Sequence, residues 1–360
     1  MISRIWKIKL KVFWIKLLNW EYWSRNIVYT LPFFPYVYCS IKARSFFFFS
    51  ATNPAIFIGG MFGESKYDLY QLFPTSLQPD TVLIKEGENI TELENFISSK
   101  NLHFPLIAKP DQGGMGWEVE KIENVSELQK YWVEHPIDII IQEFIELEEE
   151  YSLFYYKIPG ELKGNITSIT KKTPLIIVGN GKQTLEQLVY ENQRSIVLYY
   201  DFKARFESVW NEIVPENHKI IINAIGNHAR GSIFINQTAK TNSADLKKLE
   251  VLIDNIVEKS PGIYFGRFDI KTKNFESLVQ GKHFKIIEFN GAGAIPTHIF
   301  EPNFPFFAGQ KQLIKHIHIM FKIANKLHKS HGVKYISWNE YKKYFKLSNQ
   351  YAQKVKKTCI

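Results

Sequence analysis

The sequence predicts an α+β protein that divides into two or three lobes, and three observations support this class. At 360 residues the chain is long enough to bury a large core. Its apolar share of 45% and charged share of 22% are ordinary for a globular protein. From Ser50 onward, segments with strand character are interspersed with helical segments that begin at capping residues. Cys39 and Cys359 are the only cysteines, which excludes a disulfide framework or a thiolate metal cluster.

Residues 1–50 form a basic, aromatic segment that differs from the rest of the chain. Eight Lys and Arg residues stand against one acidic residue here, whereas the other 310 residues are nearly balanced, so the body has no nucleic-acid-binding character. We do not expect a signal peptide, because charges are scattered through the apolar part and no small-residue cleavage pattern follows. The longest uncharged run, 26–41, contains Pro32 and Pro35 and is too short to span a bilayer.

Two alternatives remain for this segment. It is either an interfacial anchor on an anionic membrane, or an arm that packs on the protein's own body or on a second subunit. We favour the membrane surface because basic charge and aromatic side chains coincide, as in Trp6, Trp14 and Phe46–Phe49.

The elements of the body are predicted from turn residues, caps and apolar runs. Thr91 with Glu94 three residues later is a capping-box pattern, Ser126 and Thr184 are expected caps, and Pro261-Gly262 ends a helix. The expected helices are 66–73, 91–99, 126–135, 184–189, 245–259 and 308–329. The expected strands are 103–109, 118–122, 138–144, 151–158, 176–178, 220–225, 232–236 and 263–271, with a further strand through 288–290.

Lys109 ends a strand that runs directly into a glycine loop, 111–117. Free main-chain N–H groups of such a loop, with a nearby ammonium, hold nucleotide phosphates, and glycines permit their close approach. The spacing matches neither the Walker A pattern nor the dinucleotide fingerprint. The glycine loop alone is weak evidence for a nucleotide site. It lies upstream of an acidic stretch, 146–150, and of two polar strands near the end of the body, and the order of these three segments is informative about function.

Those two strands bring polar side chains to one face. Because side chains alternate along a strand, Arg267 and Asp269 share a face, as do Glu288 and Asn290. If the strands pair, the oxygen donors Asp269, Glu288 and Asn290 form a set suited to Mg²⁺ rather than zinc. The alternative is a surface hairpin with an Arg–Asp salt bridge. The subsequent Gly291-Ala-Gly-Ala294 is expected to let the backbone approach a ligand.

The lysine with its glycine loop, the acidic stretch and the two polar strands follow one another in an order that resembles the ATP-grasp superfamily of carboxylate–amine ligases. This superfamily includes D-alanine–D-alanine ligases, glutathione synthetase-like enzymes and cyanophycin synthetases. The resemblance covers about residues 60–300. It implies an ATP-grasp fold in which two α/β lobes grip ATP, with residues 1–50 replacing most of the usual first domain. The segments 178–188 and 228–238 resemble elements of the cyanophycin synthetase-like and glutathione synthetase-like branch.

The resemblance also implies roles for individual residues. Lys66 and Lys109 would contact the nucleotide, the glycine loop would close over its phosphates, and Glu143, Phe144 and Ile145 would meet the adenine. Glu150 would bind the ribose, although Glu146, Glu148 and Glu149 leave its register open. Arg267 would face the transferred phosphate and Arg230 the acceptor. The remaining implied residues are the loop glycines Gly113, Gly114 and Gly116 and the magnesium ligands Asp269, Glu288 and Asn290.

The implied activity is an ATP-dependent ligase that joins a carboxylate to an amine through an acyl phosphate, with two Mg²⁺ ions that Mn²⁺ can replace. The alternatives are an enzyme that modifies a surface polymer or lipid-linked precursor, and a non-catalytic nucleotide-binding scaffold. We expect small-molecule carboxylate and amine substrates, an anionic membrane surface for residues 1–50 and no nucleic acid, and a homodimer stays open. The expected location is cytoplasmic, at the inner face of the membrane.

The expected domains are the segment 1–50, a reduced linker region 51–100 carrying Lys66, a small lobe 101–160, a large lobe 161–305 with the metal site, and a C-terminal helix and basic tail 306–360. Outside the motifs, His298 is a candidate for the substrate site. Lys171 and Lys172 are interpreted either as phosphate ligands or as a solvated strand edge. The histidines of the last helix, His316 among them, are interpreted as an exposed basic face in preference to a metal site, because carboxylate partners are lacking.

Overall fold

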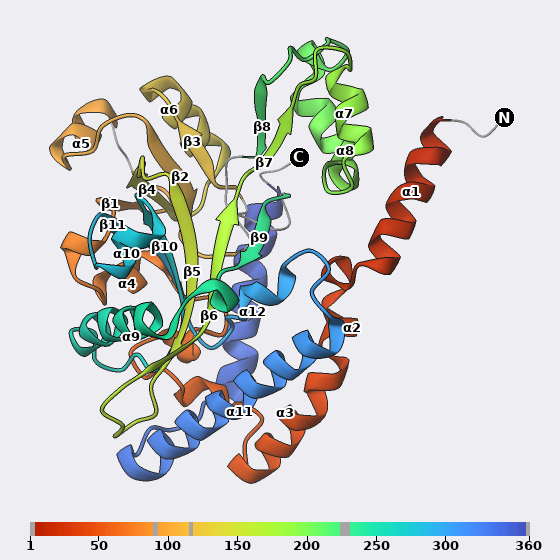
Figure 1. Cartoon of the computed structure of the whole chain (residues 1–360). Coiled ribbons are helices and arrows are strands. Elements are labelled where there is room, and N and C mark those ends of the chain that lie inside the picture. Colours follow the sequence, from red (N-terminus) through yellow and green to blue (C-terminus); the bar gives the residue numbers. More distant parts are fainter. Residues whose placement is uncertain (1–3, 89–92, 115–117, 224–230, 358–360) are drawn as a thin grey trace.

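The computed structural model describes residues 4–88, 93–114, 118–223 and 231–357. Two antiparallel sheets form the centre, and helices from the two ends of the chain pack beside them (Figure 1). The predicted α+β class is confirmed. Among the described residues, no helix is long and apolar enough to cross a membrane.

The N-terminal segment is helical and packs on the body. It contains α1 (Arg4–Leu18), η1 (Trp20–Tyr22), α2 (Arg25–Val28) and α3 (Thr30–Ala43). Ile8 of α1 is buried against the α7 and α8 region, and the Trp20 indole N–H donates to the Phe304 carbonyl at 2.6 Å. Contacts with the protein's own body, one of the two expected alternatives, are therefore present. The loop after α3 contains η2 (Phe48–Ala51) and η3 (Phe57–Gly60).

The smaller sheet has the strand order β1-β4-β2-β3. Its strands are β1 (Thr81–Ile84), β2 (Leu106–Pro110), β3 (Glu120–Ile122) and β4 (Ile139–Glu143), and α4 (Lys66–Gln71), η4 (Thr75–Leu77), α5 (Leu93–Ser99) and α6 (Val125–Glu134) accompany it. Asn124, rather than the expected Ser126, caps α6, because its side chain accepts the Glu127 N–H at 3.0 Å. Thr91 lies outside the described residues.

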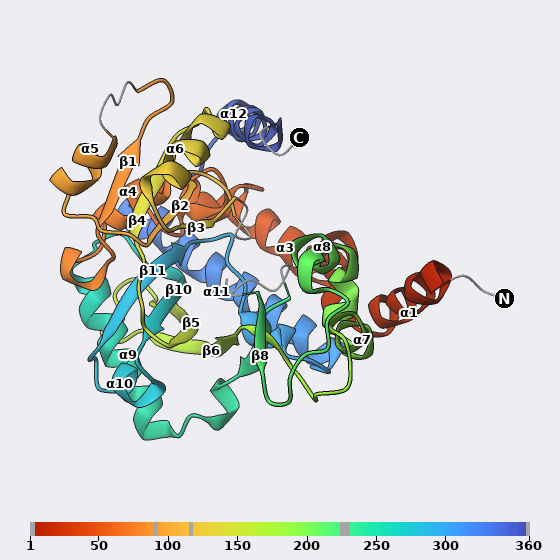
Figure 2. The same ribbon diagram turned by 90° about the horizontal axis from the view of Figure 1, so that it is seen from above.

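The larger sheet has the order β11-β10-β5-β6-β9 (Figure 2). Its strands are β5 (Glu149–Tyr156), β6 (Asn165–Thr173), β9 (Ile233–Asn236), β10 (Phe265–Thr272) and β11 (Phe284–Asn290). One face packs on α9 (Ser243–Glu258) and α10 (Phe275–Val279) through a core that includes Leu153, Ile253, Phe268 and Phe289. Because side chains alternate, the polar residues of the same strands face the other way.

A small unit stands beside this sheet. It pairs β7 (Leu175–Val178) with β8 (Lys219–Asn223) and adds α7 (Leu185–Glu191), η5 (Ser195–Leu198), α8 (Tyr199–Arg205) and η6 (Glu207–Val209). Thr184 caps α7, as predicted, and it also forms a complete capping box with Gln187. η8 (Thr238–Lys240) comes after β9.

The C-terminal part returns to the centre of the molecule. η9 (Thr297–Phe300) leads into α11 (Phe306–His331), which lies along α3 (Figure 1). The basic tail expected after it contains a second helix, α12 (Trp338–Lys357). Tyr341 of α12 stacks on Phe47 with ring centroids 4.5 Å apart, and Tyr351 donates to the Asp138 carbonyl at 3.0 Å. The tail thus joins the N-terminal segment to the smaller sheet.

Candidate functional site

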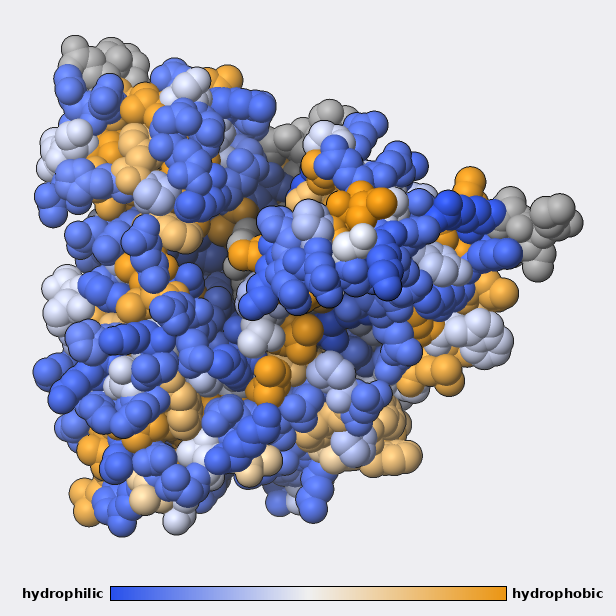
Figure 3. Space-filling view, turned by 45° about the horizontal axis from the view of Figure 1, so that its top comes forward, coloured by the Kyte–Doolittle hydropathy of each residue, from blue (hydrophilic) through white to orange (hydrophobic). Residues whose placement is uncertain are grey.

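A cavity of about 2210 Å³ opens where the two sheets face one another, and it reaches the N-terminal helices. Figure 3 shows the surface hollowed between the main mass and the smaller unit beside it. Twelve of the residues implied by the resemblance lie in its wall: Lys66, Lys109, Gly113, Gly114, Glu143, Phe144, Ile145, Glu150, Arg267, Asp269, Glu288 and Asn290. Gly116 and Arg230 lie outside the described residues.

The two predicted nucleotide lysines enter the cavity from the side of the smaller sheet. Lys109 is the penultimate residue of β2, is buried, and donates from Nζ to Tyr70 Oη and Gln142 Oε1, each at 2.9 Å. Lys66 begins α4 and donates to the main-chain oxygens of Asp111 at 3.2 Å and Gly113 at 2.8 Å. Burial lowers the pKa of Lys66. A lysine held only by neutral oxygens can still neutralise an incoming anion.

The glycine loop starts beside Lys66 and is open on its outer side. A Cβ built on Gly113 or Gly114 would meet nothing within 4 Å, and Gly113 has a φ of +127°, which favours glycine. The loop's anchor is Asp111, whose carboxylate accepts the Ser65 hydroxyl at 3.0 Å and the Tyr67 N–H at 2.9 Å. The loop is therefore fixed at its base and unobstructed above.

The predicted adenine segment leaves β4 at the edge of the cavity. The Glu143 N–H donates to the Asp80 carbonyl at 2.8 Å, which fixes the start of the segment. Lys121 and Lys271 place their ammonium groups 4.7 and 5.3 Å from the Phe144 ring centroid, and Lys271 also donates to the Ile145 carbonyl at 3.1 Å. Burial lowers the pKa of Lys271. The ring is thus flanked by two cations at the cavity wall.

A network of charged side chains lies on the polar face of the larger sheet, at the wall of the cavity. Arg267 donates to both carboxylate oxygens of Asp269 at 2.9 Å, Lys172 lies 3.1 Å from Asp269, and Lys172 also pairs with Glu150 at 2.7 Å. Burial alone would raise the pKa of Asp269, but the two cations outweigh it and hold that pKa well below its usual range. Lys172 is buried, so the solvated-edge interpretation is wrong for this residue.

The expected pairing of the two polar strands is present. Arg267 lies opposite Asn290, and Asp269 opposite Glu288. A bulge after Asp269 adds Ile287 to β11, and the polar face is retained on both strands. The salt-bridge alternative also holds in part, because Arg267 and Asp269 form an ion pair, although Asp269 is only 1% exposed rather than on the surface.

The donor set fits a hard cation at Glu288 and Asn290. No described residue holds the Glu288 carboxylate by a hydrogen bond or ion pair, and the Asn290 side chain, whose Oδ1 is the atom able to ligate a cation, forms no hydrogen bond with a described residue. Both oxygens of Asp269, in contrast, already accept from Arg267. No cluster of three His, Cys, Asp or Glu side chains within the described ranges is arranged around a metal. Glu288 and Asn290 are the residues free to hold one.

The glycines after Asn290 serve the protein's own packing. A Cβ on Gly291 would lie 2.6 Å from the Gly59 carbonyl oxygen and 2.9 Å from Gly60 Cα. Ala292 and Gly293 donate their N–H groups to the Gly59 and Gly60 carbonyls at 2.9 and 2.8 Å. The close approach expected for a ligand is therefore made to η3, in the loop that comes after α3.

Two histidines near the cavity are buried and neutral. The His298 ring contacts the Ser168 hydroxyl at 2.7 Å, and the His316 ring contacts the Thr167 hydroxyl at 2.8 Å. Burial lowers the pKa of each to about 4. The interpretation of His316 as part of an exposed basic face is wrong, because α11 turns this residue toward β6 and only its other face toward solvent.

Several residues of the site were not predicted. Gln142 and Tyr70 hold Lys109, and Lys172 holds Asp269, but both arrangements depend on strand pairing that no local pattern reveals. Lys271 could have been predicted from the sequence, because strand alternation puts it on the same face as Asp269. Glu64 also lines the cavity, with Oε2 buried and without a partner in the described part of the chain, and burial raises its pKa.

Comparison with known proteins gives matches by structure alone. No protein-family model matches the chain, and no curated protein matches its sequence. A bifunctional glutathione synthetase from Pasteurella multocida aligns with a TM-score of 0.39 and 14% identity over 71% of this chain and 35% of its own length. D-alanine–D-alanine ligase from Bacillus anthracis complexed with ATP aligns with a TM-score of 0.44 and 13% identity over 74% of this chain and 68% of its own.

VanG D-Ala:D-Ser ligase from Enterococcus faecalis aligns with a TM-score of 0.42 and 15% identity over 73% of this chain and 62% of its own. The chain thus spans about a third of the length of the glutathione synthetase and about two thirds of the length of the ligases. At TM-scores and identities this low the likeness adds no argument about function, which rests on the geometry of the site.

Proposed function

We propose that this chain is an ATP-grasp ligase that joins a carboxylate to an amine at the expense of ATP. The observation that carries the proposal is that two separate groups of residues, one from each sheet, converge on one cavity. Two lysines and an open glycine loop approach from the smaller sheet, and a half-buried arginine with oxygen donors approaches from the larger one. A module that only binds nucleotide has no use for the second set, which disfavours the scaffold alternative.

In the proposed reaction a substrate carboxylate oxygen attacks the γ-phosphorus of ATP, and the bond to the bridging oxygen of ADP breaks. The amine nitrogen then attacks the acyl carbon, inorganic phosphate leaves, and the nitrogen loses a proton. Lys66 and Lys109 would bind the phosphates, and Arg267 would orient and neutralise the transferred group. Glu288 and Asn290 would hold Mg²⁺, which when bound supplies further charge neutralisation at the phosphate oxygens.

The proposal is tested first by nucleotide binding and turnover. Purified protein is titrated with Mg-ATP by calorimetry, and phosphate release is then screened against pooled amino acids, dipeptides and small carboxylates. Stimulation by one pool, lost in Glu288→Gln while ATP binding persists, supports the ligase. Failure to bind Mg-ATP at millimolar concentration overturns it.

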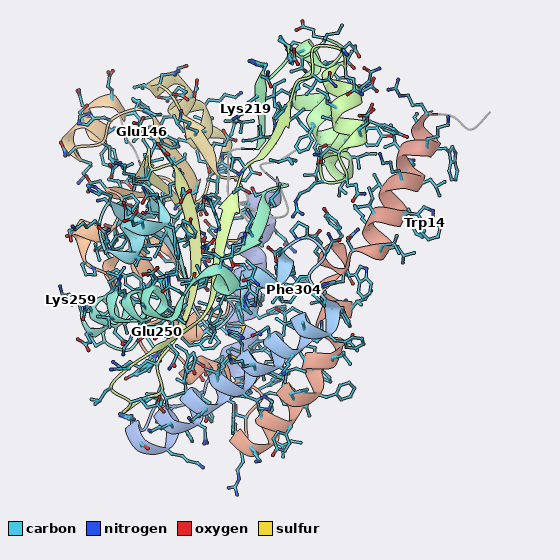
Figure 4. The ribbon with its side chains drawn as sticks, viewed as in Figure 1. Trp14, Glu146, Lys219, Glu250, Lys259 and Phe304 are labelled. Atoms are coloured by element: carbon cyan, nitrogen blue, oxygen red, sulfur yellow. The ribbon has the colours of Figure 1, made fainter. Side chains whose placement is uncertain are left out.

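We also propose that residues 1–50 bind an anionic membrane surface, and the outer face of α1 supports this second proposal. Ile8, Val12 and Ile15 pack on the body, whereas the opposite side presents an exposed apolar stripe at helical spacing: Trp6, Leu10, Phe13 and Leu17. Figure 3 shows apolar side chains on this projecting edge, and Figure 4 shows Trp14 on the side of α1 that points away from the rest of the chain.

Basic residues flank this stripe and suit an anionic lipid surface. On a helix with 3.6 residues per turn, Lys7 lies on one side of the stripe and Lys9 and Lys16 on the other. Each lysine near such a surface contributes about 1 kcal/mol of attraction. We expect co-sedimentation with phosphatidylserine vesicles and not with phosphatidylcholine vesicles. The double variant Trp6→Ser, Leu10→Ser should lose it, whereas Val133→Ser, an exposed apolar residue of α6, should not.

A further inference from the structure

The cavity continues beyond the proposed phosphate site into a compartment with a different lining. Beside Asn290 the wall also includes Ala292 and Ala294, and further lining residues come from α2, α3 and α11. Arg25 of α2 and His316 of α11 lie in this wall, and the His316 ring is hydrogen-bonded to Thr167 and Gln312. The other residues that these helices contribute are apolar or aromatic and include Val28, Phe33, Tyr36, Leu313, Ile317 and Met320. We call this part, defined by these six residues, the apolar arm.

The arm is built by two helices that pack side by side. Leu313, Ile317 and Met320 succeed one another at intervals of four and three, so α11 presents them on one face. Tyr36 and Ile317 pack against the core between α3 and α11, which also contains Cys39 and Phe48. The arm therefore rests on a packed support, and its shape is part of the fold.

The arm reaches the surface on the side of the N-terminal segment. Phe33 and Tyr29 both line the cavity and are 55% and 38% exposed, so they stand at an opening. Around them α2 and α3 expose further apolar side chains, including Ile27, Leu31 and Phe34. Figure 1 shows α1, α2 and α3 arranged in succession along this edge of the molecule.

The lining decides what chemistry the arm recognises. None of its six side chains carries a charge, whereas the ammonium and carboxylate groups of a small amino acid would need charged or hydrogen-bonding partners once buried. A hydrocarbon chain needs no such partner, and each fully buried methylene tightens binding about fourfold. The polar end of such a molecule would lie toward Asn290 and Arg267, where the chemistry is proposed.

We propose that one of the two substrates is an amphiphile, a carboxylate or amine carried on a hydrocarbon chain, and that the apolar arm binds this chain. This inference rests on the proposed ligase function for the role of the polar end. The opening beside Tyr29 and Phe33 admits the chain from the side where the N-terminal helices expose apolar surface.

The test uses unbranched alkyl carboxylates and alkylamines of six to twelve carbons, each below its micellar concentration. Binding to the full chain is measured by calorimetry, together with Mg-ATP binding on the same samples. We expect one site whose affinity for one of the two series rises at least tenfold from six to ten carbons. Phe33→Asp should weaken decyl binding at least tenfold and leave Mg-ATP binding unchanged.

Phe34→Asp is the matched control, because Phe34 is the same residue type on the same helix, is 66% exposed and does not line the cavity. It should bind decyl chains within twofold of the wild type. An affinity that does not depend on chain length, or an equal loss of affinity in both variants, overturns the inference. If the same protein samples still bind Mg-ATP, the proposed ligase function is not contradicted. Chain-length-dependent binding without Mg-ATP binding supports the arm and overturns the ligase.

Discussion

Replacing Asp269 by Asn tests whether this buried carboxylate is first of all the counter-ion of Arg267 and Lys172. Its side chain is 1% exposed, accepts two hydrogen bonds from Arg267, and lies 3.1 Å from Lys172, whose own side chain is 6% exposed. Removal of one partner from a buried ion pair costs about 3–5 kcal/mol, because the remaining charge keeps its desolvation penalty. We expect Asp269→Asn to lose about 3 kcal/mol of folding stability.

The assay is thermal unfolding in buffer with EDTA and no magnesium. For a cooperative unit of 150–250 residues, a loss of about 3 kcal/mol lowers the midpoint by roughly 6–12 °C. Glu288→Gln serves as the control, since no ion pair with a described residue holds Glu288, and it should change stability by less than about 1 kcal/mol. If Asp269 were placed mainly to hold a metal, its removal would relieve repulsion with Glu288. A midpoint equal to or above that of the wild type would therefore refute the counter-ion account.

The pH dependence gives a second check on the same variant. The cations depress the folded-state pKa of Asp269, so its contribution is present above the unfolded-state value of about 3.9. It is lost as the pH falls below that value, because the unfolded carboxylate takes up a proton before the folded one. The stability difference between wild type and Asp269→Asn should be constant near neutral pH and narrow below about pH 4.

Three more predictions concern other parts of the cavity and its supports. Lys109→Met should weaken Mg-ATP binding at least tenfold by calorimetry, since its buried ammonium lies in the cavity wall, and unchanged affinity would exclude a phosphate contact. Gly291→Ala should lower the unfolding midpoint by several degrees, because its Cβ would lie 2.6 Å from a main-chain oxygen, whereas Gly114→Ala, with nothing within 4 Å, should not; equal midpoints would contradict this packing. Stability should fall as the pH drops from about 6.5 toward 4, because the unfolded state protonates His298 and His316 before the folded state does; a double Gln variant should flatten that profile, and an unchanged profile would exclude these residues.

The sequence predicted well those features that depend on local pattern. Strand alternation put Arg267 with Asp269 and Glu288 with Asn290, and the observed pairing brings these two pairs opposite one another. The helix cap at Thr184 and the long helix α11 result from the same kind of local chemistry. The glycine loop after Lys109 begins where the apolar strand ends, as its composition indicated.

The features that sequence reasoning missed depend on long-range packing. That Lys172 neutralises Asp269 requires the pairing of β5 with both β6 and β10, and a slip of one residue would turn Lys172 to the other face. The glycines after Asn290 indicated a close approach, but only the fold reveals that Gly59 and Gly60 are the neighbours. α12 carries many charges and a single buried apolar side chain, Val355, among its described residues, so the tail gave little apolar pattern.

The central claim is that the cavity activates a carboxylate as an acyl phosphate, and hydroxylamine trapping tests it most directly. Wild-type protein is incubated with Mg-ATP, hydroxylamine and pooled carboxylates, including alkyl carboxylates, and hydroxamate is measured against ADP. We expect hydroxamate and ADP in equal amounts with one carboxylate class, and a loss of both by orders of magnitude in Glu288→Gln. ADP formation without hydroxamate, or equal activity in the variant, would contradict the account.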